Sequence, residues 1–418
     1  MNTGWQPRRS AARHRLDDFL PRAGEHYARQ RNIDEGWSGN DEGGPDTREH
    51  VSGLSPWLAR RMLTESEVVA AVIDRHGPSS SRKLVEEVLW RTYFKGWLAH
   101  RPSVWDDYQQ AQEADAGRVE VYTPRRRALA RATEGTTGIE CFDHWARELV
   151  HTGYLHNHAR MWFASIWIFT LRLPWTLGAA LFEHELLDGD AASNTLGWRW
   201  VAGLHTRGKN YLARASNIAK NTRGRFDPAD QLAEHAEPLE EDIEHPKEPL
   251  PIIDDPAPGP RSGLLLTTED LAVERSELAA LPLVSAAAGL PPSRVDPRRS
   301  ERVRRFDDQA LDDGLQRLAR HADVTPVRLH DGDAWLEDAV RWAKDQQLQR
   351  VVAMAPQVGP WESPIERLRT ALGEHAIELA LGQRRWDREL YPYTDRGFFK
   401  LRRVASKGSL LSSLCSAA

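Results

Sequence analysis

The chain has 418 residues, 40% hydrophobic and 28% charged, which is an ordinary balance for a globular protein and enough length for two or three domains. Its two cysteines, Cys141 and Cys415, exclude a disulfide framework and a four-thiolate iron–sulfur cluster, and they favour a reducing, cytoplasmic location. The net charge of −5 requires that any contact with nucleic acid come from a local basic face.

The first part of the chain, to about residue 227, is predicted to be mainly helical. Leu84 and Val88, and later Phe142, Trp145 and Leu149, recur at helical spacing, and no segment alternates as a half-buried strand would. The longest apolar run, at 161–171, is shorter than the roughly 20 residues that span a bilayer. We therefore expect a buried helix there and no membrane partner.

The composition then changes. Residues 232–260 are acidic and carry seven prolines, which helices and central strands both exclude. Beyond them, 283–288 and 351–355 are typical of buried strands, 335–344 and 363–372 of helices, and 377–381 of a further strand. The predicted fold class is mainly α: a helical domain (1–228), a linker (229–262), a small Rossmann-like α/β domain (263–404) and a disordered tail (405–418).

The sequence does not match simple motifs for binding a metal ion or a nucleotide. Asp-Gly-Asp at 188–190 begins like a calcium loop, but Ala192 and Arg199 occupy later ligand positions. His156 and His158 are two residues apart and do not share a helix face. Neither the Gly-rich dinucleotide fingerprint nor the P-loop motif occurs. We therefore predict no metal site and no Rossmann-bound FAD.

Five short motifs, each weak alone, occur together in one order. They are VSGLSPWL at 51–58, EVLWR at 87–91, TGYLHNHARM at 152–161, DGDAASN at 188–194 and WRW at 198–200. In order and rough spacing, the stretch from about 15 to 227 resembles the helical FAD-binding domain of the DNA photolyase/cryptochrome family.

The resemblance implies FAD as the cofactor. Small hydroxyl residues and backbone N–H groups at a helix start suit its pyrophosphate. Arg160 and Asp188 match a pair beside the flavin, where the cation balances a reduced, anionic ring. Asn194 matches the position facing flavin N5. The residues implied at the cofactor are Tyr27, Ser52, Gly53, Leu54, Ser55, Arg91, Asn157, Arg160, Asp188, Asp190 and Asn194.

The resemblance also implies a substrate, DNA carrying pyrimidine dimers in single or double strands, bound by a monomer. A flipped dimer needs an aromatic wall and a carboxyl partner. Glu87, Trp90, Met161 and Trp200 match the residues that contact it. Trp198 and Trp175 match the two inner residues of an electron relay. Glu87, Asn194, Trp198 and Trp175 are the residues expected to act in catalysis.

The implied activity is blue-light-driven repair of cyclobutane dimers, and the alternative is a cryptochrome-like light sensor that repairs nothing. Plain structural interpretations stay open for several residues: core packing for Trp90, a structural ion pair for Arg160 with Asp188, a turn cap for Asn194 and a helix cap for Ser55. The six cations Arg207, Lys209, Arg214, Lys220, Arg223 and Arg225 form either a solvated loop or a phosphate-facing segment.

The sequence also departs from the family pattern. Tyr154 stands where the pattern often has Trp, and Gly53 stands where it often has Arg. A polar, Gly-rich insertion separates Tyr27 from Ser52, and the outer relay position, near Ala132, lacks an aromatic. The α/β segment follows the helical domain, whereas the family usually carries an α/β antenna domain before it. A normal antenna pigment is therefore not expected.

Overall fold

The computed structural model describes residues 4–39, 43–406 and 410–416, and the chain divides into two compact units. The helical unit consists of Met1–Gly4, Glu25–Ser52 and Arg101–Pro246. The mixed unit consists of Trp5–Gly24, Gly53–His100 and Lys247–Ala418. The chain thus passes between the units several times. The boundaries predicted from composition do not include these crossings, and they stay a prediction.

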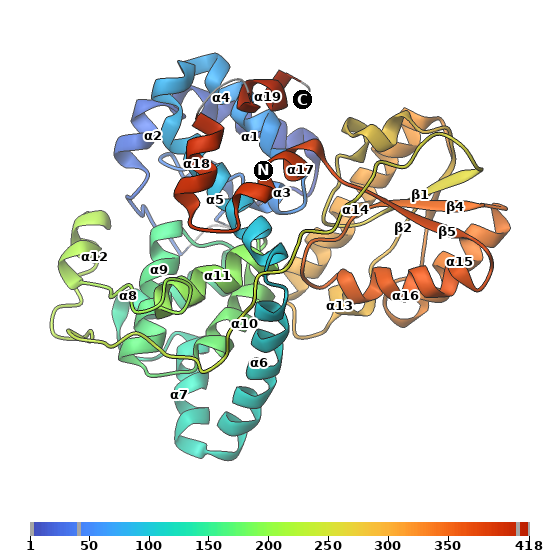
Figure 1. Cartoon of the computed structure of the whole chain (residues 1–418). Helices are drawn as coiled ribbons and strands as arrows, with labels where there is room; N and C mark the ends of the chain where they lie inside the picture. Colours follow the sequence, from blue (N-terminus) through green and yellow to red (C-terminus); the bar gives the residue numbers. More distant parts are fainter. Residues whose placement is uncertain (1–3, 40–42, 407–409, 417–418) are drawn as a thin grey trace. The chain divides into compact units, whose positions relative to one another are not determined.

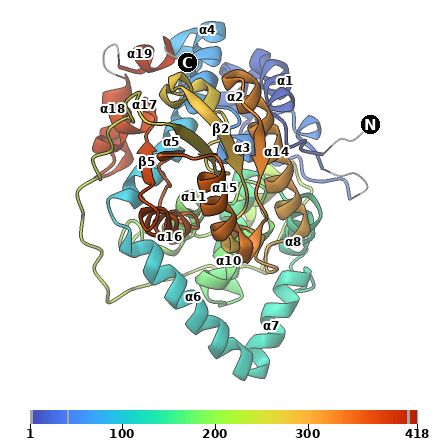
Figure 2. The ribbon, with the colours of Figure 1, turned by 90° about the vertical axis from the view of Figure 1, so that its right-hand side faces the viewer.

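The helical unit confirms the helical prediction for its part of the chain, and its described residues contain no strand. Helices α6 and α7 meet at Tyr122 and form a hairpin (Figure 2). Its elements are α2 (Glu25–Gln30), η2 (Pro45–Thr47), α6 (Ser103–Val121), α7 (Thr123–Glu134), α8 (Glu140–Thr152), α9 (Asn157–Ser165), the π-helical turn η3 (Ile166–Thr170), α10 (Trp175–Glu185), α11 (Ala191–Ala202) and α12 (Ala215–Asn221).

Aromatic side chains form the centre of this unit. Trp145, Trp162, Trp167, Phe142 and Phe163 are fully buried, and neighbouring rings stack on one another. Each such ring buries a large apolar area, so the group supplies much of the free energy that holds the helices together. Many of the tryptophans in the first half of the chain are therefore core residues.

One group of helices in the mixed unit combines segments from the first hundred residues with segments after residue 384. Thr64 caps α4 in a reciprocal capping box with Glu67, which satisfies backbone N–H groups that the first turn leaves unpaired. These helices are α1 (Arg9–Phe19), α3 (Ser55–Ala59), α4 (Glu65–Ser80), α5 (Arg82–Ala99), α17 (Arg385–Leu390), α18 (Phe398–Ser406) and α19 (Leu410–Ser416).

A five-stranded parallel sheet completes the mixed unit, in the order β3-β2-β1-β4-β5. The strands are β1 (Ser262–Leu266), β2 (Leu283–Ala288), β3 (Pro326–Arg328), β4 (Arg350–Met354) and β5 (Glu378–Gly382). Helix α14 (Glu301–Ala322) covers one face, and α15 (Trp335–Asp345) and α16 (Glu362–Gly373) cover the other (Figure 1). The small α/β layer predicted from the sequence is confirmed, with β1 and β3 as strands that the pattern did not show.

The proline-rich segment has no helix or strand before β1, in keeping with a linker or extended surface segment. Leu239 N–H donates to the Ala202 carbonyl, and Glu248 N–H donates to the His100 carbonyl, so hydrogen bonds fix parts of it. The tail differs from the prediction of disorder. Residues 410–416 form α19, because the side chain of Leu414 is buried; 407–409 and 417–418 lie outside the described residues.

Candidate functional site

An ion pair stands at the start of α9. Gly153, with φ 70°, ends α8 in the left-handed conformation, and the chain then turns into α9. Arg160 Nη2 donates to Asp188 Oδ2 at 2.8 Å, and Arg160 Nε donates to the Leu155 carbonyl at 2.9 Å. The second oxygen, Asp188 Oδ1, is buried and accepts no hydrogen bond from the described residues. The predicted pair is therefore formed, and it presents one buried acceptor.

Helix α11 begins with two of the predicted cofactor residues. Asp190 accepts hydrogen bonds from Ser193 N–H and Ser193 Oγ, both at 2.9 Å, and so caps the helix. Asn194 Nδ2 donates to the Ala179 carbonyl at 2.7 Å. That bond uses one of the two amide N–H groups, so the Asn194 side chain has a fixed orientation with its Oδ1 and its second N–H remaining. The structure thus gives Asp190 a capping role and Asn194 an oriented amide.

The two relay tryptophans differ in their surroundings. Trp198 is 2% exposed and lies edge-on to Trp167 and Phe182, at 6.1 and 5.1 Å between ring centroids. A Cβ at Gly178 of α10 would lie 2.3 Å from this indole, so the glycine permits the close packing. Trp175 is half-buried at the start of α10 and stacks on Tyr108 at 5.5 Å.

The other predicted site residues of the helical unit differ in how far they are buried. Tyr27 is buried on α2, whereas Asn157 is exposed at the first position of α9. Met161 and Trp200 are half-buried, and Trp200 stacks on Tyr211 at 5.6 Å. Ser52, also half-buried, ends the second of the three segments that make up this unit.

The mixed unit carries the rest of the Ser-rich loop. Gly53 has φ +62°, a conformation that a side chain would strain, and its carbonyl accepts a hydrogen bond from Trp5 Nε1 at 2.9 Å. Leu54 occupies the N-cap position of α3 and makes no side-chain cap, so Ser55 is the first helical residue and not the cap that one interpretation expected.

Helix α5 carries Glu87, Trp90 and Arg91. Trp90 is half-buried and stacks flat on Phe398 of α18, with ring centroids 3.8 Å apart and an interplanar angle of 8°. Arg91 Nε lies 3.5 Å from Glu65 Oε1. Burial opposes ionisation of Glu65, but Arg61, Arg91 and Lys95 outweigh it and lower its pKa to about 2. Arg91 is therefore held by a fully charged, buried carboxylate.

Sequence reasoning missed a segment that we call the strap, residues 31–39 and 43–50 within the polar insertion. Asp34 accepts hydrogen bonds from Trp145 Nε1 at 3.1 Å and Arg225 Nη2 at 2.8 Å. His156 Nε2 and the Arg31 carbonyl are 3.1 Å apart, and Arg48 Nη2 donates to Glu148 Oε1 at 2.7 Å. The strap is thus tied to α8, to the start of α9 and to the chain after α12.

The strap also changes the interpretation of the basic run. Arg225 is bonded to Asp34, and Arg223 Nη2 donates to His50 Nε2 at 2.9 Å. These two cations have partners in the protein, which a solvated or phosphate-facing segment did not predict. The only sequence signal for the strap was that charged residues interrupt a Gly-rich stretch.

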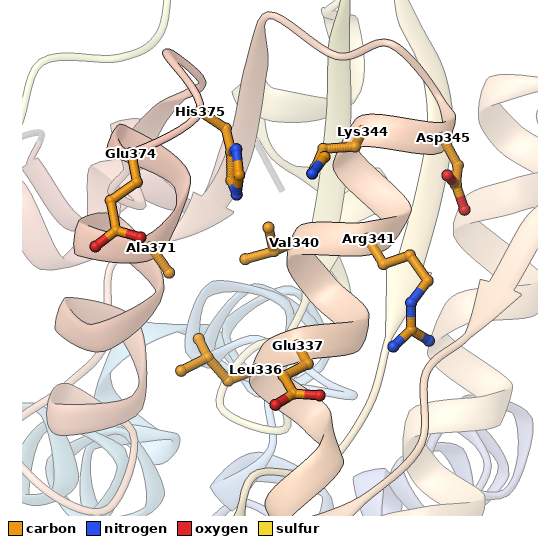
Figure 3. A pocket seen from close by; sticks show the side chains of 9 residues that line it. All are labelled: Leu336, Glu337, Val340, Arg341, Lys344, Asp345, Ala371, Glu374 and His375. Atoms are coloured by element: carbon orange, nitrogen blue, oxygen red, sulfur yellow. The ribbon is translucent and has the colours of Figure 1, made fainter.

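A shallow groove of about 440 Å³ lies between α15 and α16 in the mixed unit. Figure 3 shows its apolar floor, with Leu336 and Val340, and His375 and Lys344 above it. None of the residues predicted for cofactor or substrate lines this groove. Within the described ranges, no group of three or more His, Cys, Asp or Glu side chains is arranged to hold a metal ion, and no helix is long and apolar enough to cross a membrane.

The residues of the helical unit fit a flavin. An isoalloxazine ring offers N–H donors, carbonyl acceptors and a negative charge when reduced, and it needs complementary polar groups in an otherwise apolar site. The buried acceptor Asp188 Oδ1, the guanidinium of Arg160 and the oriented amide of Asn194 are groups that would supply those three complements.

Comparison with known proteins also points to FAD. Residues 84–238 match the family model described as the FAD binding domain of DNA photolyase. The match agrees with the resemblance predicted from the motifs, and it supports FAD as the cofactor of this part of the chain.

Individual relatives carry names of two kinds. A deoxyribodipyrimidine photo-lyase of Thermus thermophilus is 35% identical over 228 residues, which cover 52% of this chain and 48% of that protein. One of Streptomyces griseus is 34% identical over 160 residues, covering 37% and 33%. A cryptochrome DASH of Ostreococcus tauri is 32% identical over 186 residues, covering 43% and 32%. The chain thus spans about half or less of the length of these relatives.

Proposed function

We propose that this protein uses FAD and blue light to repair cyclobutane pyrimidine dimers in DNA. The observation that carries the proposal is the set of oriented polar groups in the helical unit: Arg160 paired with Asp188, and the fixed amide of Asn194. FAD held by these residues would supply light-driven one-electron chemistry, in which the dimer gains an electron, its two C–C bonds break and the electron returns, so that no net oxidation occurs. Arg160 provides fixed positive charge there, which needs no reorganisation during the reaction.

Each unit carries residues proposed for the substrate, on α5 in the mixed unit and on α11 in the helical unit. Glu87 and Trp90 are three residues apart on α5 and so share a face, where a carboxyl group and an aromatic wall can meet one flipped base. Trp90 is braced on one side by Phe398, and Trp200 is braced by Tyr211. Rings held in place lose little conformational entropy on binding, which supports their use as walls for a dimer.

The second candidate is a cryptochrome-like sensor that binds FAD but repairs nothing. The same Phe398 stack favours it, because Phe398 already occupies one face of the Trp90 ring. Phe398→Ala separates the two functions. If Phe398 braces a substrate wall, the variant repairs less; if Phe398 blocks the ring, the variant gains repair that the wild type lacks.

The direct test uses reduced, FAD-loaded protein with an oligonucleotide that contains one defined dimer, single- or double-stranded, in light and in darkness. Light-dependent loss of the dimer supports repair. Purified protein that takes up no FAD contradicts both candidates, whereas FAD uptake without repair of either DNA form leaves the sensor.

Glu87→Gln tests the substrate side. We expect normal FAD content and a fall in repair yield, because the altered side chain no longer offers a carboxyl to the base. Glu86→Gln is the matched control: Glu86 is the neighbouring carboxylate on α5 and lies 3.4 Å from both Lys83 Nζ and Arg402 Nε. Equal repair by both variants would contradict the placement of Glu87 at the substrate.

The relay is tested on the flavin itself. Trp198→Phe should strongly slow photoreduction of bound FAD, followed by its absorbance under illumination, and Trp175→Phe should slow it as well. Unchanged photoreduction in the Trp198 variant would show that electrons enter by another route, such as the buried Trp167 beside it.

A further inference from the structure

Tyr154 has two arginines over its ring in the helical unit. The Arg48 guanidinium carbon is 4.5 Å from the centre of its ring, and that of Arg160 is 5.4 Å away. Both distances are within the range of cation–π attraction. Tyr154 is 6% exposed, so the two contacts lie in a largely desolvated place where electrostatic attraction is strong.

Each guanidinium is also hydrogen-bonded to a carboxylate. Arg48 Nη2 donates to Glu148 Oε1 at 2.7 Å, and Arg160 Nη2 donates to Asp188 Oδ2 at 2.8 Å. The result is a continuous series of contacts, Glu148–Arg48–Tyr154–Arg160–Asp188, which we call the stacked row. It connects the strap and α8 with the arginine assigned to the flavin.

The two ends of the stacked row differ in their ability to change charge. Glu148 is 0% exposed, its Oε2 accepts no hydrogen bond from the described residues, and burial raises its pKa to about 7, against the attraction of Arg48. The charged groups facing Glu148 are Arg48 and Asp34 of the strap, Arg225 after α12, and His144 on its own helix, with Nε2 at 3.8 Å.

Protonation of Glu148 therefore alters the stacked row by one charge. At high pH the row has two cations and two carboxylates. When Glu148 gains a proton, Arg48 loses its compensating charge, and the potential around Tyr154 and Arg160 becomes more positive. His156, the N-cap of α9, adds no charge in this range, because burial lowers its pKa to about 4.

We propose that Arg48 and Glu148 are positioning residues for Arg160, and that the charge of Glu148 is transmitted through the Tyr154 stack to the flavin site. This inference rests on the proposed place of Arg160 beside FAD. A more positive row favours the reduced, anionic flavin. The protein would therefore hold electrons on its cofactor more readily in mildly acid than in alkaline conditions, beyond the pH dependence of flavin alone.

The test compares the flavin midpoint potential of the wild type with that of Glu148→Gln across pH, from about 5.5 to about 8.5. Glutamine mimics the protonated carboxyl, so the two potentials should agree at the acid end. The wild-type potential should fall below that of the variant as pH rises through neutrality. A constant difference, or none, would overturn the proposal.

The control is Asp143→Asn on the same helix. Asp143 is a buried carboxylate that accepts hydrogen bonds from Thr137 N–H and Gly138 N–H, both at 2.8 Å, and it belongs to a different part of α8 from Arg48. Its variant should show the wild-type pH profile. If it shows the same change as Glu148→Gln, any loss of negative charge on α8 suffices and the stacked row has no special role.

Variants of Tyr154 test the stack itself. Tyr154→Leu removes the ring and should weaken FAD binding by roughly tenfold, which corresponds to about 1.4 kcal/mol. It should also abolish the pH-dependent difference. Tyr154→Trp keeps an aromatic face and should restore both properties, which a merely space-filling role would not require. If Tyr154→Leu binds FAD like the wild type, the ring does not transmit the effect.

An additional measurement separates this inference from the FAD assignment. In the flavin-free protein, the infrared band of a protonated carboxyl should disappear between about pH 5.5 and 8.5, and Glu148→Gln should lack that change. Protein that never binds FAD would contradict the proposed function even if this titration occurs. Protein that binds FAD but shows no carboxyl titration would contradict only the role of Glu148.

Discussion

Glu148 in the helical unit and Asp307 in the mixed unit are both fully buried carboxylates, yet their pKa values shift in opposite directions. Burial raises the pKa of both, and it prevails at Glu148, which titrates near 7. At Asp307, Arg294, Arg60 and Arg299 outweigh burial and lower the pKa to about 2.

The partners explain the difference. Asp307 accepts a hydrogen bond from Arg60 Nε at 2.6 Å and another from Arg294 Nη2 at 2.5 Å, with Arg299 at 3.7 Å. Glu148 accepts a hydrogen bond from one arginine, Arg48, and its other oxygen accepts no hydrogen bond from the described residues. A buried carboxylate stays ionised only when several donors replace water, so the count of donors separates a permanent structural charge from a titrating one.

The largest expected effect on stability is that of Asp307→Asn. Removing its charge leaves three arginines without their buried counter-ion, which should cost about 3–5 kcal/mol in the free energy of unfolding. Urea denaturation at neutral pH measures the loss. Asp308→Asn is the control, since its side chain is 46% exposed and its pairing with Arg328 should contribute at most about 1 kcal/mol. Equal losses would break the comparison.

His156→Asn tests how the stability of the helical unit changes at low pH. In the wild type, His156 Nδ1 accepts the His158 N–H at 3.1 Å, so protonation of Nδ1 breaks the cap of α9. Its pKa is lowered from 6.5 to about 4, chiefly by burial. The contribution of neutral His156 to the free energy of unfolding is fully present above pH 6.5, and it is lost as the pH falls towards 4.

Asparagine keeps an acceptor at the cap without gaining charge. The variant should therefore lose about 2–3 kcal/mol less than the wild type between neutral pH and pH of about 4, by urea unfolding. His144 and His205 also have pKa values lowered to about 4, so some acid sensitivity should persist in the variant. Parallel curves for the two proteins would contradict a buried, neutral His156.

Glu148→Gln should have the opposite pH dependence. Because the folded-state pKa is raised from 4.5 to about 7, the stability linked to this carboxyl is present below 4.5 and is lost as pH rises through 7. Relative to the wild type, the variant should gain about 2–3 kcal/mol between these limits, measured by urea unfolding. The Asp307→Asn profile should show no such gain, which sharpens the contrast between the two carboxylates.

The smallest effect concerns Asp190, which was predicted to bind FAD and caps α11 in the structure. Asp190→Ala should lose about 1 kcal/mol, whereas Asp190→Asn, which keeps a capping oxygen, should lose a few tenths. Titration of the flavin-free variants with FAD then tests the cofactor role. A weaker affinity in Asp190→Asn, with stability intact, would show that the charge contacts FAD as well as capping the helix.

Secondary structure was predictable where the chain states it locally. Residues 283–288 form β2 as predicted, because a continuous apolar run bounded by turns suits a strand buried on both faces. Strand β1 begins at Ser262 and Gly263 directly after the prolines, and β3 has only three residues, so neither showed a clear pattern. Helix α19 was missed because only Leu414 of its seven residues is buried.

The candidate site was predictable in part. The motifs led to Arg160 with Asp188, and the structure contains that ion pair. They did not reveal that Asp190 is engaged as a cap, nor that Phe398, far along the chain, stacks on Trp90. A motif identifies a residue by its neighbours in sequence, whereas these contacts depend on which distant segment packs beside it.

The sequence by itself determined the helical character of the first half, the small parallel α/β layer and the resemblance to FAD-binding domains, because periodicity, apolar runs and motifs are written in consecutive residues. The tertiary structure alone decided the pairing of Arg48 with Glu148, which lie 100 residues apart, and the contact of two arginines with the Tyr154 ring. Burial and the number of donors around a carboxylate set its charge, and both arise only when separate segments of the chain pack together.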